Sequence, residues 1–133
     1  MTKQNPEIDS DFIFIYSRRE AIFDGLRRDV SEVAREAGIR HPTFITQGAY
    51  GQFVNVPPDV DGQDEPGRLW DVVWMLACAI RQTDGTSDRL PFQLYVRNSN
   101  DEEPALVTLQ AVCGPLDFDD PQPTITIMLP DED

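Results

Sequence analysis

The order of apolar and polar positions predicts helices and short strands in the first two-thirds of the chain, and strands in the last third. Phe12–Tyr16 is apolar and β-prone throughout, which is typical of a buried strand. Ser17 begins a short predicted helix, with Glu three residues later, and Gly25 ends it. A second short helix is predicted between an N-cap at Ser31 and a terminating glycine at Gly38.

The middle of the chain is less clearly patterned. Thr43–Thr46 could form a strand, and Gln47–Val54 could form either a weak helix or a strand. Gly48 and Gly51 disfavour the helix there by about 1 kcal/mol each relative to alanine. Residues 57–67 contain three prolines, two glycines and four acidic residues, and this composition predicts a loop.

The longest predicted helix runs from Pro66 to about Gln82. Proline is tolerated in a first helical turn, where its missing N–H has no partner to lose. Apolar residues surround most of this helix, so a central, buried position is expected. Trp70 and Trp74 are one turn apart and are predicted to share a face that packs in the core. The apolar run Val72–Ile80 is too short to span a bilayer.

Three β-prone segments follow, and each predicts a strand: Pro91–Arg97, Ala105–Val112 and Pro123–Leu129. The first two alternate apolar with polar residues, which is typical of half-buried strands. Short links between consecutive strands favour an antiparallel meander. The fold class expected is therefore α+β, with a mainly antiparallel sheet, chiefly residues 91–129, packed against the helix at about 66–82. Residues 1–10 are expected to be a flexible segment, and residues 11–133 a single globular domain.

The charge of the chain excludes some partners. With 24 acidic and 11 basic residues, the net charge is −13 and the pI is about 4.2. Such a protein repels nucleic acid and anionic membranes and attracts basic surfaces. No direct binding to nucleic acid or to a membrane is expected, and the N-terminus lacks the layout of a secretion signal, so a cytoplasmic location is expected.

The acidic excess is concentrated after Arg97, where nine acidic residues face no basic residue. If residues 116–119 are extended, the carboxylates of Asp117 and Asp119 point the same way, about 6–7 Å apart. Duplex DNA carries one charge per 3.4 Å along each strand, so such rows can stand in for phosphates. The predicted partner-binding residues are these nine: Asp101, Glu102, Glu103, Asp117, Asp119, Asp120, Asp131, Glu132 and Asp133. The alternative is that these acids only protect Ile125–Leu129 from aggregation.

Patterns that would indicate catalysis or metal binding are weak. The single histidine, His41, is predicted to lie on the surface or in a turn. Asp59, Asp61 and Asp64 are possible calcium ligands, but the glycine of an EF-hand loop is misplaced. Pairs of carboxylates arise by chance among 24 acidic residues, so they do not indicate a glycosidase. No enzyme activity, no cofactor and no metal are therefore predicted.

Two cysteines occur, Cys78 and Cys113, and both are predicted to be small buried apolar residues. Their sequence contexts leave a disulfide between them open, although no dense disulfide framework exists.

Five stretches in order are YSRREAIFDG, DVSEVAREAG, GRLWDVVWMLACAIR, LVTLQAVCGP and ITIMLPDED. Together they resemble a family of small uncharacterised acidic bacterial proteins, a domain of unknown function carried on plasmids and other mobile elements. The chain departs from the family pattern around Gln47–Val54, where a bulkier segment with a tryptophan is expected. The resemblance implies a mobile-element context and assigns no catalytic residue.

Two functions follow as expectations. The first is a non-catalytic inhibitor or adaptor whose DNA-mimicking acidic surface binds a basic host protein that handles nucleic acid or acts in defence. The second is an accessory plasmid or phage protein that makes its contacts through an apolar or mixed surface.

Overall fold

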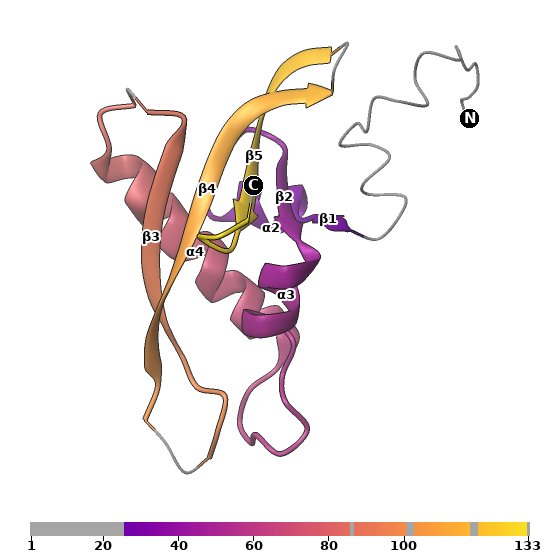
Figure 1. The fold of residues 1–133 in the computed structure, drawn as a ribbon, viewed down its shortest axis with the longest axis vertical. Helices are drawn as coiled ribbons and strands as arrows, with labels where there is room; N and C mark the ends of the chain where they lie inside the picture. Colours follow the sequence, from indigo (N-terminus) through magenta and orange to yellow (C-terminus); the bar gives the residue numbers. More distant parts are fainter. Residues whose placement is uncertain (1–25, 86, 101–102, 118–119, 133) are drawn as a thin grey trace, which may run out of the picture.

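The computed structural model describes residues 26–85, 87–100, 103–117 and 120–132 (Figure 1). The helices and strands of these residues are, in chain order, β1 (Arg27–Asp29), α2 (Ser31–Glu36), β2 (Thr43–Thr46), α3 (Gln47–Phe53), α4 (Glu65–Gln82), β3 (Arg89–Val96), β4 (Ala105–Asp117) and β5 (Asp120–Met128). The strands form one sheet in the order β1-β2-β5-β4-β3. The predicted α+β class is confirmed. The predicted strand at 12–16 and the first predicted helix lie outside the described residues.

The sheet is mainly antiparallel, as predicted. β3, β4 and β5 form the expected meander, β1 pairs antiparallel with β2, and β2 pairs with β5 in parallel. The strands predicted at 105–112 and 123–129 were too short at the ends that face each other along the chain, because β4 continues to Asp117 and β5 begins at Asp120. Pairing between β4 and β5 extends to Asp117↔Asp120, and this part of the two strands projects beyond the rest of the sheet (Figure 1).

The core lies between the sheet and the helices α2 and α4. Its fully buried side chains come from both layers, and the largest aliphatic ones are Ile45, Leu76, Leu109, Ile127, Val54, Val72 and Val73. β3 and β4 direct alternate side chains into this core, since successive residues of a strand face opposite sides. The alternation read from the sequence of residues 91–97 therefore placed the core side of β3 correctly.

The ambiguous segment after β2 is the helix α3. Thr46 caps it, with its side-chain oxygen accepting from the N–H of Ala49 at 3.2 Å. Gly48 permits a close approach, because a Cβ there would lie 3.0 Å from a carboxylate oxygen of Glu132. Packing against the C-terminal turn thus explains why a glycine stands at position 48, although glycine has a low helix propensity.

The predicted N-cap of α2 was wrong in detail. The Ser31 hydroxyl accepts from the N–H of Thr43, so it joins α2 to β2 and does not cap the helix. The Asp29 carboxylate accepts from the N–H of Ser31 at 2.9 Å. Gly38, with φ of +99°, ends the segment as predicted.

Candidate interaction surface

α4 begins at a well-formed cap and buries one side. The Asp64 carboxylate accepts from the N–H of Gly67 at 2.7 Å, and Pro66 lies in the first turn. The side chains directed at the sheet are almost completely buried: Val72, Val73, Leu76 and Ala77. This inner side of α4 is the stripe expected of a helix that covers one face of a sheet.

The opposite side of α4 is exposed, which makes the prediction of core tryptophans wrong. Trp70 is 36% exposed, Trp74 41% and Met75 37%, and Asp71 is also exposed. We call these four residues the α4 outer face. A helix packed on one face of a sheet can bury only one stripe, so the apolar residues on its far side remain in solvent.

The two indoles of the α4 outer face stack on each other. Their ring centroids are 5.7 Å apart and their planes differ by 20°. The guanidinium of Arg81 lies 5.2 Å from the Trp74 ring centroid, and Arg81 also donates to the carbonyl oxygen of Ala37 at 3.0 Å. These contacts hold the indoles in place before any partner arrives, which lowers the entropy lost on binding.

Asp71 adds a carboxylate to this face. It lines a hollow of about 160 Å³ whose wall includes Leu94 and Tyr95 of β3. Burial raises the pKa of the Asp71 carboxyl above its usual value of 3.8. Arg68 and Arg97 line the same hollow, and the guanidinium groups of both donate to carbonyl oxygens of the protein.

Arg68, one turn before Asp71, is buried on the inner side. Its guanidinium donates to the side chain of Gln63 at 2.6 Å, to the carbonyl of Asn55 at 2.7 Å, and to the carbonyl of Arg97 and the side chain of Asn98. Burial lowers the pKa of Arg68, and the charge of Arg97 lowers it further. Because its donors are occupied by neutral oxygens, Arg68 joins two loops to α4 and is not available to a ligand.

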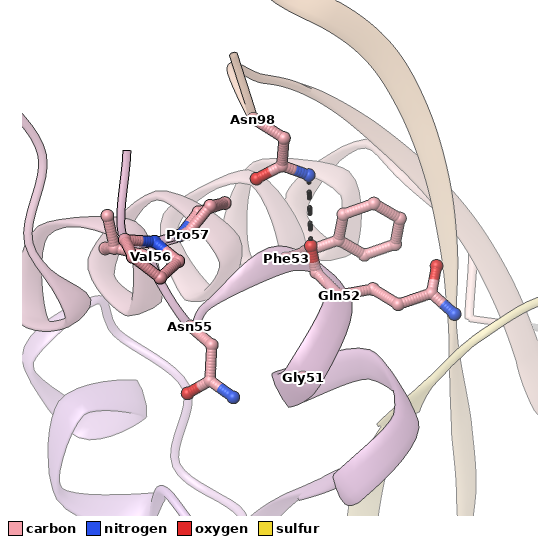
Figure 2. A pocket seen from close by; sticks show the side chains of 8 residues that line it. Gly51, Gln52, Phe53, Asn55, Val56, Pro57 and Asn98 are labelled. Atoms are coloured by element: carbon pink, nitrogen blue, oxygen red, sulfur yellow. Dashed lines mark hydrogen bonds between the residues drawn. The ribbon is translucent and has the colours of Figure 1, made fainter. Parts of the chain in front are cut away.

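Figure 2 shows a second hollow, beside the end of α3, of about 450 Å³. Asn98 crosses it and donates to the carbonyl of Gln52 at 3.2 Å. It is lined by Gly51, Gln52, Phe53, Asn55, Val56, Pro57, Pro58 and Asn98. None of these side chains ionises near neutral pH, so this hollow offers no group for acid–base catalysis.

The predicted acidic surface is dispersed among the described residues. Glu103 precedes β4 and Asp117 ends it, and the 13 residues of β4 span roughly 40 Å. Figure 1 shows the β3–β4 link and the β4–β5 hairpin at opposite ends of the molecule. Asp117 and Asp120 are cross-strand neighbours in the backbone, so these two are brought together. Asp101, Glu102, Asp119 and Asp133 lie outside the described residues.

The acids of the C-terminal turn have different environments. Asp131 is exposed, whereas the Glu132 carboxylate accepts from the Thr46 hydroxyl at 2.7 Å and from the N–H of Leu129 at 2.8 Å. Gln110 in the middle of β4 donates to the carbonyl of Glu132 at 3.2 Å. The Glu132 side chain therefore holds the C-terminal turn against Thr46, the cap of α3, and its backbone carbonyl joins the turn to β4. Its partner Thr46 is 86 residues away, which no local pattern reveals.

The other candidate residues are also placed. His41 is exposed in a bend, as predicted, and Asp64 caps α4. Cys78 is half-buried and Cys113 exposed, and both are free thiols, so the prediction of a buried Cys113 was wrong. Cys113 lies on β4 opposite Ile125 of β5.

Within the described ranges, no group of three or more His, Cys, Asp or Glu residues is arranged to hold a metal ion. No helix among these residues combines the length and the apolar character needed to cross a bilayer.

No protein-family model, no curated protein and no solved structure matches the chain. The family resemblance of the five sequence stretches thus remains a prediction, and the α4 outer face is the feature that bears on function.

Proposed function

We propose that the protein is a non-catalytic interaction module that binds a basic partner protein through the α4 outer face. The observation that carries this proposal is the pair of stacked, exposed indoles of Trp70 and Trp74 beside Met75. Tryptophan and methionine are enriched where proteins meet, and tryptophan supplies much of the binding energy at such interfaces.

The charge of the chain selects the class of partner. A net charge of −13 attracts basic proteins and repels acidic ones, including a second copy of the chain. On the α4 outer face the Asp71 carboxylate lies next to the indoles, and an incoming Lys or Arg could pair with that carboxylate and stack on an indole. Proteins that handle nucleic acid carry such basic surfaces, so they are the partner class proposed.

This proposal moves the contact away from the C-terminal acids. The described members of that set are separated along β4, and the Glu132 carboxylate is occupied within the protein. Charges separated by more than about 8 Å are largely screened at physiological salt, so dispersed clusters act independently. The inhibitor hypothesis is retained with the α4 outer face as its contact surface.

The test is capture of basic proteins from a lysate of the host cell, comparing two double variants. Trp70→Ser with Trp74→Ser should abolish retention of the partner. Leu26→Ser with Leu106→Ser is the matched control, because both leucines are 51% exposed and neither lies on α4. The control should retain the partner at the wild-type level.

A third variant separates the two surfaces. Asp117→Asn with Asp120→Asn neutralises the carboxylates at the β4–β5 hairpin and leaves α4 unchanged. Retention should persist in this variant, with a small decrease at low salt. Loss of the partner here, together with retention in the double Trp variant, would overturn the proposal in favour of the acidic surface.

A further inference from the structure

Among the residues that the structure describes, β3 is an edge strand of the sheet, and part of its outer edge is unpaired. Its only neighbour among them is β4, with which it pairs without a break from Arg89↔Val112 to Val96↔Ala105. The N–H of Cys113 donates to the carbonyl of Asp88 at 2.8 Å, so the even-numbered residues of β3 are the ones that form hydrogen bonds with β4. In an antiparallel pair, alternate residues exchange hydrogen bonds with the neighbour. The odd-numbered residues of β3 therefore direct their backbone N–H and C=O groups outward.

Both ends of this outer edge are closed by the protein itself. At one end the Ser87 hydroxyl accepts from the N–H of Arg89 and donates to its carbonyl. At the other end the carbonyl of Arg97 accepts from Arg68 and from Gln63. The open part of the edge is thus the short stretch from 91 to 95.

The open stretch offers five backbone groups. They are the carbonyl of Pro91 and both the N–H and the carbonyl of Gln93 and of Tyr95, and all three residues are exposed. Pro91 has no N–H and so removes one donor. Proline on an edge strand hinders continuous pairing with a long strand. The remaining groups suit a segment of about five residues.

A groove runs along this edge between β3 and α4. Around Pro91–Gln93 it is a hollow of about 460 Å³ whose α4 wall is formed by Met75, Cys78, Ala79 and Gln82. Around Leu94–Arg97 a second hollow of about 160 Å³ follows along the same strand, lined by Asp71 and also by Arg68 and Arg97. The guanidinium groups of these two arginines donate to carbonyl oxygens of the protein. One end of the groove is therefore mainly apolar, and the other contains the Asp71 carboxylate.

We propose that this groove binds an extended segment of the basic partner, which adds to β3 as a sixth strand of the sheet. The segment carries an apolar side chain in the hollow beside Met75 and a Lys or Arg two positions further on, directed at Asp71. Residues two apart in a strand point to the same side, about 7 Å apart, and the long basic side chain covers the remaining distance. Such strand addition combines backbone hydrogen bonds with pockets for alternate side chains.

Charge decides between the possible occupants. A second copy would bring another chain with a charge of −13 against the first, which opposes edge-to-edge pairing of two β3 strands. A basic segment is attracted by the same negative charge. This inference rests on the proposed function for the identity of the partner; its backbone contacts lie on β3, and its side-chain contacts use Met75 and Asp71 of the α4 outer face.

The test uses a display library of random ten-residue peptides selected on the full-length protein. Enriched peptides should share a large apolar residue and a Lys or Arg two positions later, with no proline between them. Their binding should slow hydrogen exchange at the backbone N–H groups of Gln93 and Tyr95. Failure to enrich any peptide, or enriched peptides that leave these two amides unprotected, would overturn the proposal.

A matched pair of variants removes one backbone donor. Gln93→Pro deletes an outward N–H, as Pro91 already does in the native strand, whereas Gln93→Ala keeps it. The proline variant should bind the enriched peptides at least about tenfold more weakly and the alanine variant at the wild-type level. If the proline variant does not fold, peptides that are N-methylated at alternate positions replace it, because methylation removes backbone N–H donors from the peptide. Undiminished binding by every methylated peptide would contradict strand addition.

The outcomes distinguish this inference from the proposed function. Loss of partner capture in the double Trp variant, with no effect of Gln93→Pro, would leave the α4 outer face as the binding surface and refute strand addition. A dimer of the protein alone that Gln93→Pro dissociates would assign the edge to a second copy, and so would also overturn the inference.

Discussion

The inner and outer sides of α4 are both rich in apolar residues, but only the inner side is buried. Leu76 on the inner side is fully buried, while its neighbour Met75 is 37% exposed. The inner stripe is sufficient to cover the sheet, so the outer apolar residues are not needed to close the core. The difference teaches that apolar character along a helix does not by itself report burial: here only the inner stripe is needed for folding.

The comparison extends to the charged residues of the same helix. Arg68 on the inner side has its guanidinium occupied by neutral oxygens of two loops, whereas Asp71 on the outer side is exposed at a hollow, where partial burial raises the pKa of its carboxyl. The folded protein itself supplies the hydrogen-bond acceptors of Arg68 on the inner side. On the outer side, a partner could supply a cation for the carboxylate of Asp71.

The sharpest test of this comparison substitutes two adjacent residues. Leu76→Ala should lower the free energy of unfolding by about 2–5 kcal/mol, because it leaves a cavity in the core. Met75→Ala should change it by no more than about 0.5 kcal/mol, because the side chain is largely in solvent. Urea denaturation of both variants measures the two values. A large loss for Met75→Ala would mean that another molecule or segment covers the outer side.

Arg68→Met should have the next largest effect. Its guanidinium serves several buried acceptors, and its removal leaves them without donors, at a cost of about 2–4 kcal/mol. Arg68→Lys should recover little of this, since one ammonium group cannot reproduce the planar set of donors. Arg40→Met, at an exposed arginine, is the control and should be nearly neutral in the same denaturation experiment.

Trp74→Ala should cost about 1 kcal/mol of stability, through the lost indole stack and the lost contact with Arg81. Because Trp70 and Trp74 are the only tryptophans, the native fluorescence reports on the α4 outer face alone. Acrylamide should therefore quench the folded protein to an extent that approaches quenching of the urea-unfolded chain. Strong protection from acrylamide in the folded state would contradict the exposure of the indoles.

The fold was predictable where local patterns coincide with tertiary structure. Alternating residues in 91–97 and 105–112 identified β3 and β4, and the proline followed by an apolar run identified α4. β1 was not predicted, since its three residues, Arg27–Asp29, carry no apolar alternation and are extended only because they pair with β2.

The candidate site was less predictable, because it depends on which side of an element meets another. Hydrophobicity predicted that Trp70 and Trp74 are buried, but the sequence does not specify that one sheet covers a single side of α4. The open edge at Gln93 depends on the strand order and on hydrogen bonds made by the side chains of Ser87 and Arg68. The pattern of apolar and polar residues predicts neither. Sequence could reveal only one sign of an edge strand, which is Pro91.

The smallest expected effect is the pH dependence that Asp71 contributes. Its carboxyl has a higher pKa in the folded than in the unfolded chain, because burial disfavours the charge. The folded state therefore holds more protons between the two pKa values, and stability falls as pH rises through that window. Below the unfolded pKa the carboxyl is neutral in both states and contributes nothing. Above the folded pKa the full penalty remains.

Asp71→Asn removes this charge and should raise the stability at pH 7 by less than about 1 kcal/mol, since the residue is exposed and solvent screens it. The difference from the wild type should shrink as the pH falls to about 3, which urea denaturation at both pH values would measure. A variant less stable than the wild type at pH 7 would mean that a cation within the chain already pairs with Asp71. In that case the outer charge of α4, like the inner one, would have its partner inside the protein, and the contrast between the two sides of the helix would hold for the apolar residues alone.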